Sequence, residues 1–149
     1  MNTTHDLDKY IRPSARRTTN CPGCGNGILA QSILRAIDDE KLDMDDFTFV
    51  SGIGCAAWIP SPFFYADILH TTHGRPIAFA TGIKLASPDR NVMVVSGDGD
   101  LLAIGGNHLI HAARRNINMT VICVNNYIYG MTGGQVAPTT PMGLKTMTT

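Results

Sequence analysis

Two aspartates, Asp98 and Asp100, stand among glycines directly after an apolar run in "VVSGDGDLLAIGGNHL", residues 94–109. A carboxylate beside a buried strand is costly unless it is paired or binds a cation. A second polar pair, Asn125 and Asn126, follows another apolar run, "NMTVICV". Carboxylate, amide and carbonyl oxygens suit an octahedral Mg²⁺ whose other positions go to water and phosphate oxygens. Asp98 and Asn126 are therefore candidate magnesium ligands.

The glycines on either side of Asp98 favour a bound diphosphate. Gly97 and Gly99 let the backbone come close to the anion, and the N-terminus of a following helix attracts negative charge. Taken alone, "GDG" and "NN" are weak signals, because both are also common in turns. The order strand, GDG, helix, strand, NN is a narrower pattern, and it predicts a magnesium–diphosphate site.

The cysteines lie in glycine-rich loops. Cys21 and Cys24 form the CxxC of "NCPGCGNG", and Cys55 ends "SGIGC". A zinc ribbon would need a second CxxC, and a thioredoxin-like redox motif normally follows a strand, whereas this motif follows a polar segment. Three such cysteines suit an iron–sulfur cluster, which normally takes four thiolates. The fourth cysteine, Cys123, lies inside "VICVNN" and is expected to be a small core residue.

The elements that would position these residues alternate between helices and strands. Continuous apolar strands separated by helices predict a doubly wound, mostly parallel α/β sheet. A crossover helix brings the loops that carry Asp98 and Asn126 to one sheet edge, where ligands bind in such folds. The expected elements are a polar arm over 1–20, helices over 26–40, within 74–88 and over 101–116, strands over 47–51, 91–96 and 119–124, an ordered loop over 59–69, and no periodic pattern after 130.

Composition excludes several classes of function. Twelve basic and twelve acidic side chains give a formal net charge of zero, which argues against a nucleic-acid surface. No apolar run approaches the roughly 20 residues that a membrane-spanning helix needs, and the N-terminus carries no secretory signal pattern. We therefore expect a cytoplasmic protein that binds neither nucleic acid nor membrane.

Five motifs together resemble the β subunit of 2-oxoacid:ferredoxin oxidoreductases, and most closely the 2-oxoglutarate branch. They are "CPGCGNG", "SGIGCAAW", "LHTTHGRPIAFATGIKLA", "GDGDLLAIGGNHLIHAARRN" and "NNYIYGMTGGQVAPTTP", spread over residues 15–141. The resemblance implies a thiamine diphosphate-binding (diphosphate-domain) fold with thiamine diphosphate, Mg²⁺ and a 4Fe–4S cluster as cofactors. It also implies an α subunit, ferredoxin, coenzyme A and a 2-oxoacid as partners and substrates.

The resemblance also assigns roles to individual residues. His73 is the candidate catalytic residue, which would meet the cofactor or the substrate carboxylate, although a buried structural histidine is the alternative. The implied magnesium ligands are Asp98, Asn126 and Ile128, and the implied cluster ligands are Cys21, Cys24 and Cys55. The implied cofactor-binding residues are Ile53, Gly54, Cys55, Ala56, Thr72, His73, Gly74, Gly99, Asp100, Gly130 and Met131.

The implied reaction is oxidative decarboxylation of 2-oxoglutarate with coenzyme A to succinyl-CoA and CO₂. Electrons would pass through the cluster to ferredoxin. Three alternatives stay open at this point. The substrate could be pyruvate or another 2-oxoacid, the enzyme could be a non-oxidative thiamine diphosphate decarboxylase, or the chain could be a zinc-stapled binding module.

The chain departs from the family in length. Family β subunits are considerably longer, so we expect an apparently truncated domain, with residues 1–20 as an arm and 21–149 as the thiamine diphosphate-binding domain. Thiamine enzymes also need a glutamate near the cofactor, and the only glutamate here is Glu40, in the acidic run "DDEKLDMDD". We therefore expect the partner α subunit to supply the activating glutamate.

Overall fold

The computed structural model describes residues 5–15 and 18–149. Its centre is a four-stranded sheet in the order β2-β1-β3-β4, in which every pairing is parallel. The strands are β1 (Phe47–Ser51), β2 (Asp67–His70), β3 (Asn91–Gly97) and β4 (Thr120–Val124). The α/β class and the parallel sheet expected from the sequence are confirmed.

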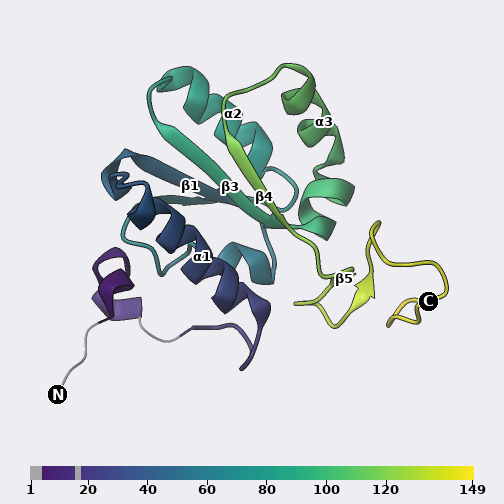
Figure 1. The fold of residues 1–149 in the computed structure, drawn as a ribbon. Coiled ribbons are helices and arrows are strands. Elements are labelled where there is room, and N and C mark those ends of the chain that lie inside the picture. The colour runs from purple at the N-terminus through teal and green to yellow at the C-terminus, as the bar shows by residue number, and fades with distance from the viewer. Residues whose placement is uncertain (1–4, 16–17) are drawn as a thin grey trace.

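Helices cover both faces of this sheet, as Figure 1 shows. The helix α1 (Gly25–Asp39) lies on one face, and α2 (Pro76–Ala86) and α3 (Gly106–Arg114) lie on the other. The predicted helices at 26–40 and within 74–88 and the predicted strands at 47–51, 91–96 and 119–124 all match observed elements within one or two residues.

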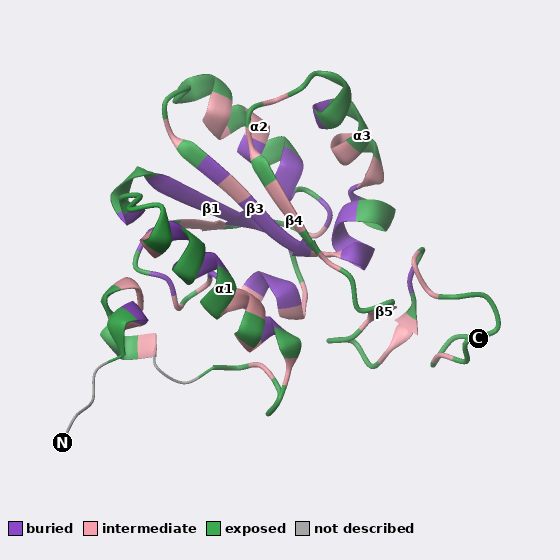
Figure 2. Cartoon of the chain, in the orientation of Figure 1, coloured by how far each residue is buried: buried purple, intermediate pink, exposed green. Residues whose placement is uncertain are grey.

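Each sheet face has its own apolar core. On the α1 side, Leu34 and Ile37 pack with Phe49 of β1. On the other side, Ile77 of α2 packs with Val50 and Val94. Figure 2 shows β1 buried along its length, and three of its five residues, Phe47, Phe49 and Val50, are apolar.

The single helix expected over 101–116 is two elements. A π-helix, η5 (Gly99–Ile104), follows β3 and is separated from α3 by Gly105. The Gly105 amide donates to the Asp100 carbonyl at 2.8 Å, and a Cβ on Gly105 would lie 2.7 Å from that same oxygen. The chain can therefore turn here only because residue 105 has no side chain.

The expected loop over 59–69 ends in a strand. Its last residues and His70 form β2, which pairs with β1 at the edge of the sheet. β2 is partly exposed and lacks a continuous apolar run, so its sequence carries no strand signal. Beyond residue 126, two short strands, β5 (Ile128–Tyr129) and β6 (Gln135–Val136), form an antiparallel pair.

The described part of the N-terminal segment is docked on the domain and is not a free arm. It forms two 3₁₀ helices, η1 (Asp6–Tyr10) and η2 (Pro13–Ala15). The first packs against α1, and the backbone of Tyr10 and Arg12 forms hydrogen bonds with the loop before β2. Leu7 is buried, and the Arg12 guanidinium donates to the carbonyls of Phe64 and Ala66 at 2.9 and 2.7 Å.

None of the helices in residues 5–15 and 18–149 combines the length and the apolar character that a membrane-spanning helix needs.

Candidate functional site

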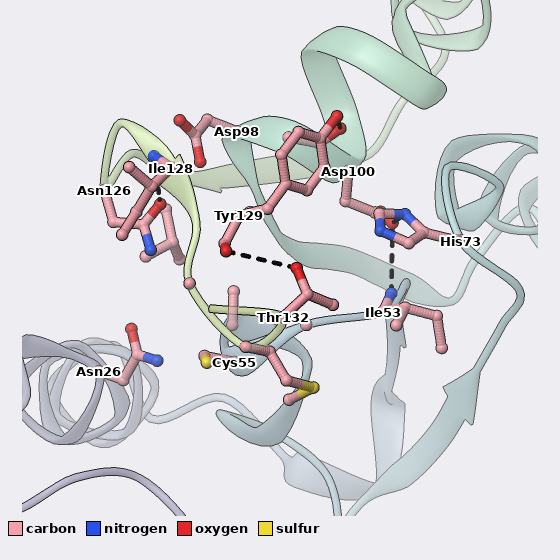
Figure 3. Close-up of a pocket in the computed structure, with 17 residues that line it drawn as sticks. Asn26, Ile53, Cys55, His73, Asp98, Asp100, Asn126, Ile128, Tyr129 and Thr132 are labelled. Atoms are coloured by element: carbon pink, nitrogen blue, oxygen red, sulfur yellow. Dashed lines mark hydrogen bonds and ion pairs between the residues drawn. The ribbon is translucent and has the colours of Figure 1, made fainter. Parts of the chain in front are cut away.

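The loops that follow the strands enclose a pocket at the carboxyl edge of the sheet. It contains about 580 Å³ of empty space, part of it open to solvent, and Figure 3 shows its walls. Parallel strands meet at this edge, where α/β proteins commonly bind ligands. The walls are Asn26, Ile53, Gly54, Cys55, Ala56, His73, Gly97, Asp98, Gly99, Asp100, Val124, Asn126, Ile128, Tyr129, Gly130, Met131 and Thr132.

The two proposed magnesium ligands lie in this pocket on neighbouring loops. Asp98 follows β3, and Asn126 follows β4. Gly97 and Val124 are register partners, so the ends of the two strands lie side by side. Asp98 is 1% exposed, and its Oδ2 accepts a hydrogen bond from the Thr139 hydroxyl. The sheet thus brings together two residues that are far apart in the sequence.

The loop after β4 begins with a tight turn at Asn126. The Asn126 Oδ1 atom accepts from the Ile128 amide at 3.2 Å, which forms a tight turn. Tyr127 in this turn has a positive φ of 65°. The turn directs the chain so that Ile128, Tyr129 and Gly130 line the same pocket as Asp98.

Tyr129 holds the Asp98 loop against the Asn126 loop. Its hydroxyl donates to the Gly99 carbonyl at 3.1 Å, and a Cβ on Gly99 would lie 2.5 Å from the tyrosine ring. Burial raises the pKa of Tyr129, and the carboxylates of Asp98 and Asp100 raise it further. The tyrosine therefore stays a neutral donor in this acidic corner.

The carboxylate of Asp100 connects three loops. Its Oδ1 accepts from the Gly74 amide at 2.7 Å and from the Ile53 amide at 3.3 Å. Its Oδ2 accepts from the Ser96 hydroxyl at 2.7 Å. The side chain is buried, with only 1% of it exposed, so protein donors replace the water that it has lost.

His73 lies beside this carboxylate. Its Nδ1 atom contacts Asp100 Oδ1, while about a third of the side chain is exposed along the pocket. Thr72 and Gly74, which flank it, do not line the pocket. Thr72 is exposed, whereas Gly74 is buried against Ile104 and contributes its amide to Asp100.

Cys21 and Cys24 lie close enough to Cys55 to affect its thiol. Burial raises the pKa of the Cys55 thiol, and the nearby Cys21 and Cys24 raise it further. Cys55 begins the short helix η4 (Cys55–Trp58), and the Cys24 amide donates to the Cys21 carbonyl at 3.0 Å. Within the described ranges, however, no three His, Cys, Asp or Glu side chains are grouped tightly enough to hold a metal ion.

Cys123 was expected in the core, and that expectation is wrong. Its side chain is exposed because β4 forms an edge of the sheet, with β3 on one side only. An apolar run is typical of a strand that is buried between two neighbouring strands. β4 carries such a run, "VICV", although it lies at the edge of the sheet, so the sequence alone did not show that Cys123 would be exposed.

Four pocket residues were not singled out from the sequence: Asn26, Val124, Tyr129 and Thr132. Asn26 follows the CxxC motif, is 7% exposed and donates to Asn20 Oδ1 at 3.2 Å. Tyr129 and Thr132 fall inside the "NNYIYGMTGG" motif. The available signal for these residues was their place within or directly before a motif that the sequence analysis had already identified.

Residues 52–149 match the family model described as thiamine pyrophosphate enzyme, C-terminal TPP binding domain. The chain belongs to this family. The match begins at the end of β1 and includes the loops after β2, β3 and β4, which form most of the thiamine pyrophosphate enzyme pocket described above.

Curated relatives of this thiamine pyrophosphate enzyme domain are similar over most of the chain. The 2-oxoglutarate synthase subunit KorB of Methanocaldococcus jannaschii is 58% identical over 144 residues, which cover 97% of this chain and 53% of that protein. The 2-oxoglutarate oxidoreductase subunit KorB of Mycobacterium tuberculosis is 47% identical, covering 87% of this chain and 34% of that protein. The chain thus spans about half, or less, of the length of these relatives.

A solved structure has the same fold. The 2-oxoglutarate:ferredoxin oxidoreductase from Magnetococcus marinus, with 2-oxoglutarate, coenzyme A and succinyl-CoA bound, superposes with a TM-score of 0.89 at 40% identity. The match covers 98% of this chain and 49% of that one. The thiamine diphosphate-binding fold expected from the sequence is therefore confirmed.

The packing of Tyr129 on Gly99 predicts a specific steric effect. Gly99→Ala should lower the free energy of unfolding by about 1–3 kcal/mol, because the new methyl group overlaps the tyrosine ring. Gly106→Ala is the matched control, since a Cβ there meets no atom within 4 Å. Urea denaturation of both variants, with Tyr129→Ala completing a double-mutant cycle, measures the coupling between residues 99 and 129. Equal stability of the Gly99 and Gly106 variants would contradict the geometry.

Proposed function

We propose that this chain is the thiamine diphosphate-binding part of a 2-oxoacid:ferredoxin oxidoreductase β subunit that acts on 2-oxoglutarate. The reaction is decarboxylation of the oxoacid, with coenzyme A as acyl acceptor, to give succinyl-CoA, CO₂ and reduced ferredoxin. The names of the similar proteins and the substrates bound in the Magnetococcus marinus structure support this substrate over pyruvate.

One observation carries the proposal. Buried Asp98 and the Asn126 turn lie at the ends of adjacent strands and line one pocket with glycines on both loops. A Cβ on Gly130 would come within 3.1 Å of the Asn126 amide, so this backbone approaches its neighbours closely. Oxygen donors from Asp98, Asn126 and the Ile128 carbonyl match the preference of Mg²⁺. These residues fit a magnesium ion that neutralises a diphosphate.

Bound thiamine diphosphate would supply an electron sink for loss of CO₂ from a 2-oxoacid. The chain's own residues would hold and shield the reactants. Ile53, Ala56 and Met131 give the pocket apolar walls, which keep water from the reacting carbon. His73, exposed along the same wall, is the candidate catalytic residue.

Cys21, Cys24 and Cys55 are the proposed cluster ligands. Burial raises the pKa of Cys55, and the nearby Cys21 and Cys24 raise it further, which supports this grouping. Three thiolates leave one position of a 4Fe–4S cluster to be filled, and exposed Cys123 is not among the groups that act on Cys55. Cys55 also lines the pocket, so this residue is common to the proposed cluster site and the proposed cofactor site. All four cysteines are free, as is usual in the cytoplasm, which is the location that we propose.

We also propose that a partner subunit completes the site. Glu40 is exposed at the end of α1 and is not among the described residues that line the pocket. The glutamate that acts at the cofactor would come from another chain, the expected α subunit. Residues 21–149 would form the cofactor-binding domain, against which the described part of the N-terminal segment packs.

Asp98→Asn tests the magnesium site. The change removes the charged ligand while keeping its shape, so Mg²⁺-dependent affinity for thiamine diphosphate should fall at least about 100-fold, more than is usual for loss of an outer-shell partner. Asp89→Asn, at an exposed position after α2, is the matched control and should bind normally. Titration calorimetry on the assembled enzyme measures both. Normal affinity in the Asp98 variant would rule out the assignment.

Serine replacements test the cluster. Cys21→Ser, Cys24→Ser and Cys55→Ser should each lose the iron–sulfur absorption band and the reduction of ferredoxin, because a cluster ligand is missing. Cys123→Ser should retain both, since that side chain is exposed on β4. Metal analysis of the wild-type protein distinguishes this function from the two alternatives with other metal contents. Zinc in place of iron would favour a binding module that is stabilised by zinc. The absence of both metals would favour a non-oxidative thiamine diphosphate decarboxylase.

Reconstitution tests the partner. The isolated chain, given thiamine diphosphate, Mg²⁺, coenzyme A and 2-oxoglutarate, should reduce a dye at less than about 1% of the rate of the complex, because it lacks the proton-transferring glutamate. Adding the α subunit should restore turnover. Substitution of the sole glutamate, Glu40→Gln, should leave the complex fully active. Robust turnover by the chain alone would overturn the proposed role of the partner.

A further inference from the structure

The Asp100–His73 pair carries an inference beyond cofactor binding. An ionised carboxylate only accepts hydrogen bonds, and the Asp100 carboxylate already takes them from Ile53, Gly74 and Ser96. Both of its oxygens are engaged in the protein. A fully engaged, buried anion is poorly suited to contact a second anion such as a diphosphate.

The Nδ1 atom of His73 has one polar neighbour. It is buried and lies in close contact with Asp100 Oδ1, and no hydrogen bond of good geometry links it to any described residue. Because the carboxylate accepts only, the nitrogen that faces it must carry the hydrogen. In a neutral imidazole the other nitrogen, Nε2, is then an acceptor. Since Nδ1 is buried and part of the ring is exposed in the pocket, Nε2 belongs to the accessible edge.

We propose that Asp100 is a positioning residue that holds His73 as the Nδ1–H tautomer and so presents Nε2 to the pocket as a proton acceptor. During reaction, Nε2 takes a proton from a hydroxyl or thiol of a bound reactant, whose oxygen or sulfur keeps the electron pair. The imidazolium that forms is balanced by the Asp100 charge. The acceptor role rests on the proposed function, whereas the tautomer does not.

The surroundings of Asp100 leave it little freedom to move. A Cβ on Gly52 would lie only 2.0 Å from Asp100 Oδ2, so the end of β1 presses against the carboxylate. The π-helix that carries Asp100 is fixed in turn by the Gly105 amide, which donates to the Asp100 carbonyl. The backbone of two loops thus determines where Oδ1 lies, and Oδ1 determines which way the His73 ring faces.

The tautomer can be measured without enzyme activity. In the full chain labelled with ¹⁵N-histidine, at a pH well above about 6.5 where an ordinary histidine is neutral, two-bond ¹⁵N–¹H spectra report which nitrogen bears hydrogen. His73, assigned from the spectrum of His73→Gln, should be the Nδ1–H form in the wild type. Asp100→Ala should convert it to the Nε2–H form.

Two further variants separate positioning from packing. Asp100→Asn should keep the Nδ1–H form, because the amides of Ile53 and Gly74 hold its side-chain oxygen where Oδ1 was. Ser96→Ala removes only the bond to Oδ2 and should also keep it. A wild-type Nε2–H form overturns the proposal, and this result needs no variant to fold. An unchanged tautomer in a folded Asp100→Ala overturns it as well.

Steady-state kinetics of the assembled enzyme test the acceptor role. Asp100→Ala should lower kcat by about 100-fold or more while KM for the oxoacid changes less than about threefold, because a positioned base acts in the transition state. Ser96→Ala should keep kcat within about threefold. An Asp100→Ala enzyme with wild-type kcat overturns the acceptor role. If the wild-type enzyme turns over no 2-oxoacid, the proposed function fails and the tautomer result stands by itself.

Discussion

A buried carboxylate must find donors, and this constraint shapes the whole pocket. Asp100 satisfies it with the amides of Ile53 and Gly74 and the hydroxyl of Ser96. These groups come from the end of β1, the loop after β2 and β3 itself. An unpaired charge in this position would cost several kcal/mol. The hydrogen bonds to Asp100 therefore hold the end of β1 and the loop after β2 close to β3. The histidine beside Asp100 takes its orientation from this arrangement.

A second carboxylate, two residues earlier, has a different environment. Asp98 is as buried as Asp100, but a single described hydroxyl, that of Thr139, donates to it. After β3, the Asp100 carboxylate is thus fully hydrogen-bonded, whereas the Asp98 carboxylate can still bind a further partner. A cation bound at Asp98 would be that partner. For this reason we assign the magnesium site to Asp98 and the positioning role to Asp100.

Glycines make these close approaches possible. Gly52 lies against Asp100, and Gly99 lies against the Tyr129 ring, where any side chain would overlap its neighbour. The glycine-rich motifs therefore serve packing between loops as well as access for a ligand. Their spacing in the sequence reflects contacts between elements that are 30 or more residues apart, such as the hydroxyl of Tyr129 on the Gly99 carbonyl.

Local residue patterns were enough to predict the parallel α/β class, the helix at 26–40, the central strands and the placement of Asp98 and Asn126 at one edge of the sheet. Those features follow from local apolar patterns and from the rule that parallel strands end at one edge. Only the tertiary structure decided that 67–70 pairs as β2, that Leu7 and Arg12 dock the N-terminal segment, and that Cys123 is exposed. The same holds for the role of Asp100, whose partners come from separate loops. Each of these depends on which distant backbone group lies alongside, and a local pattern of residue types does not contain that information.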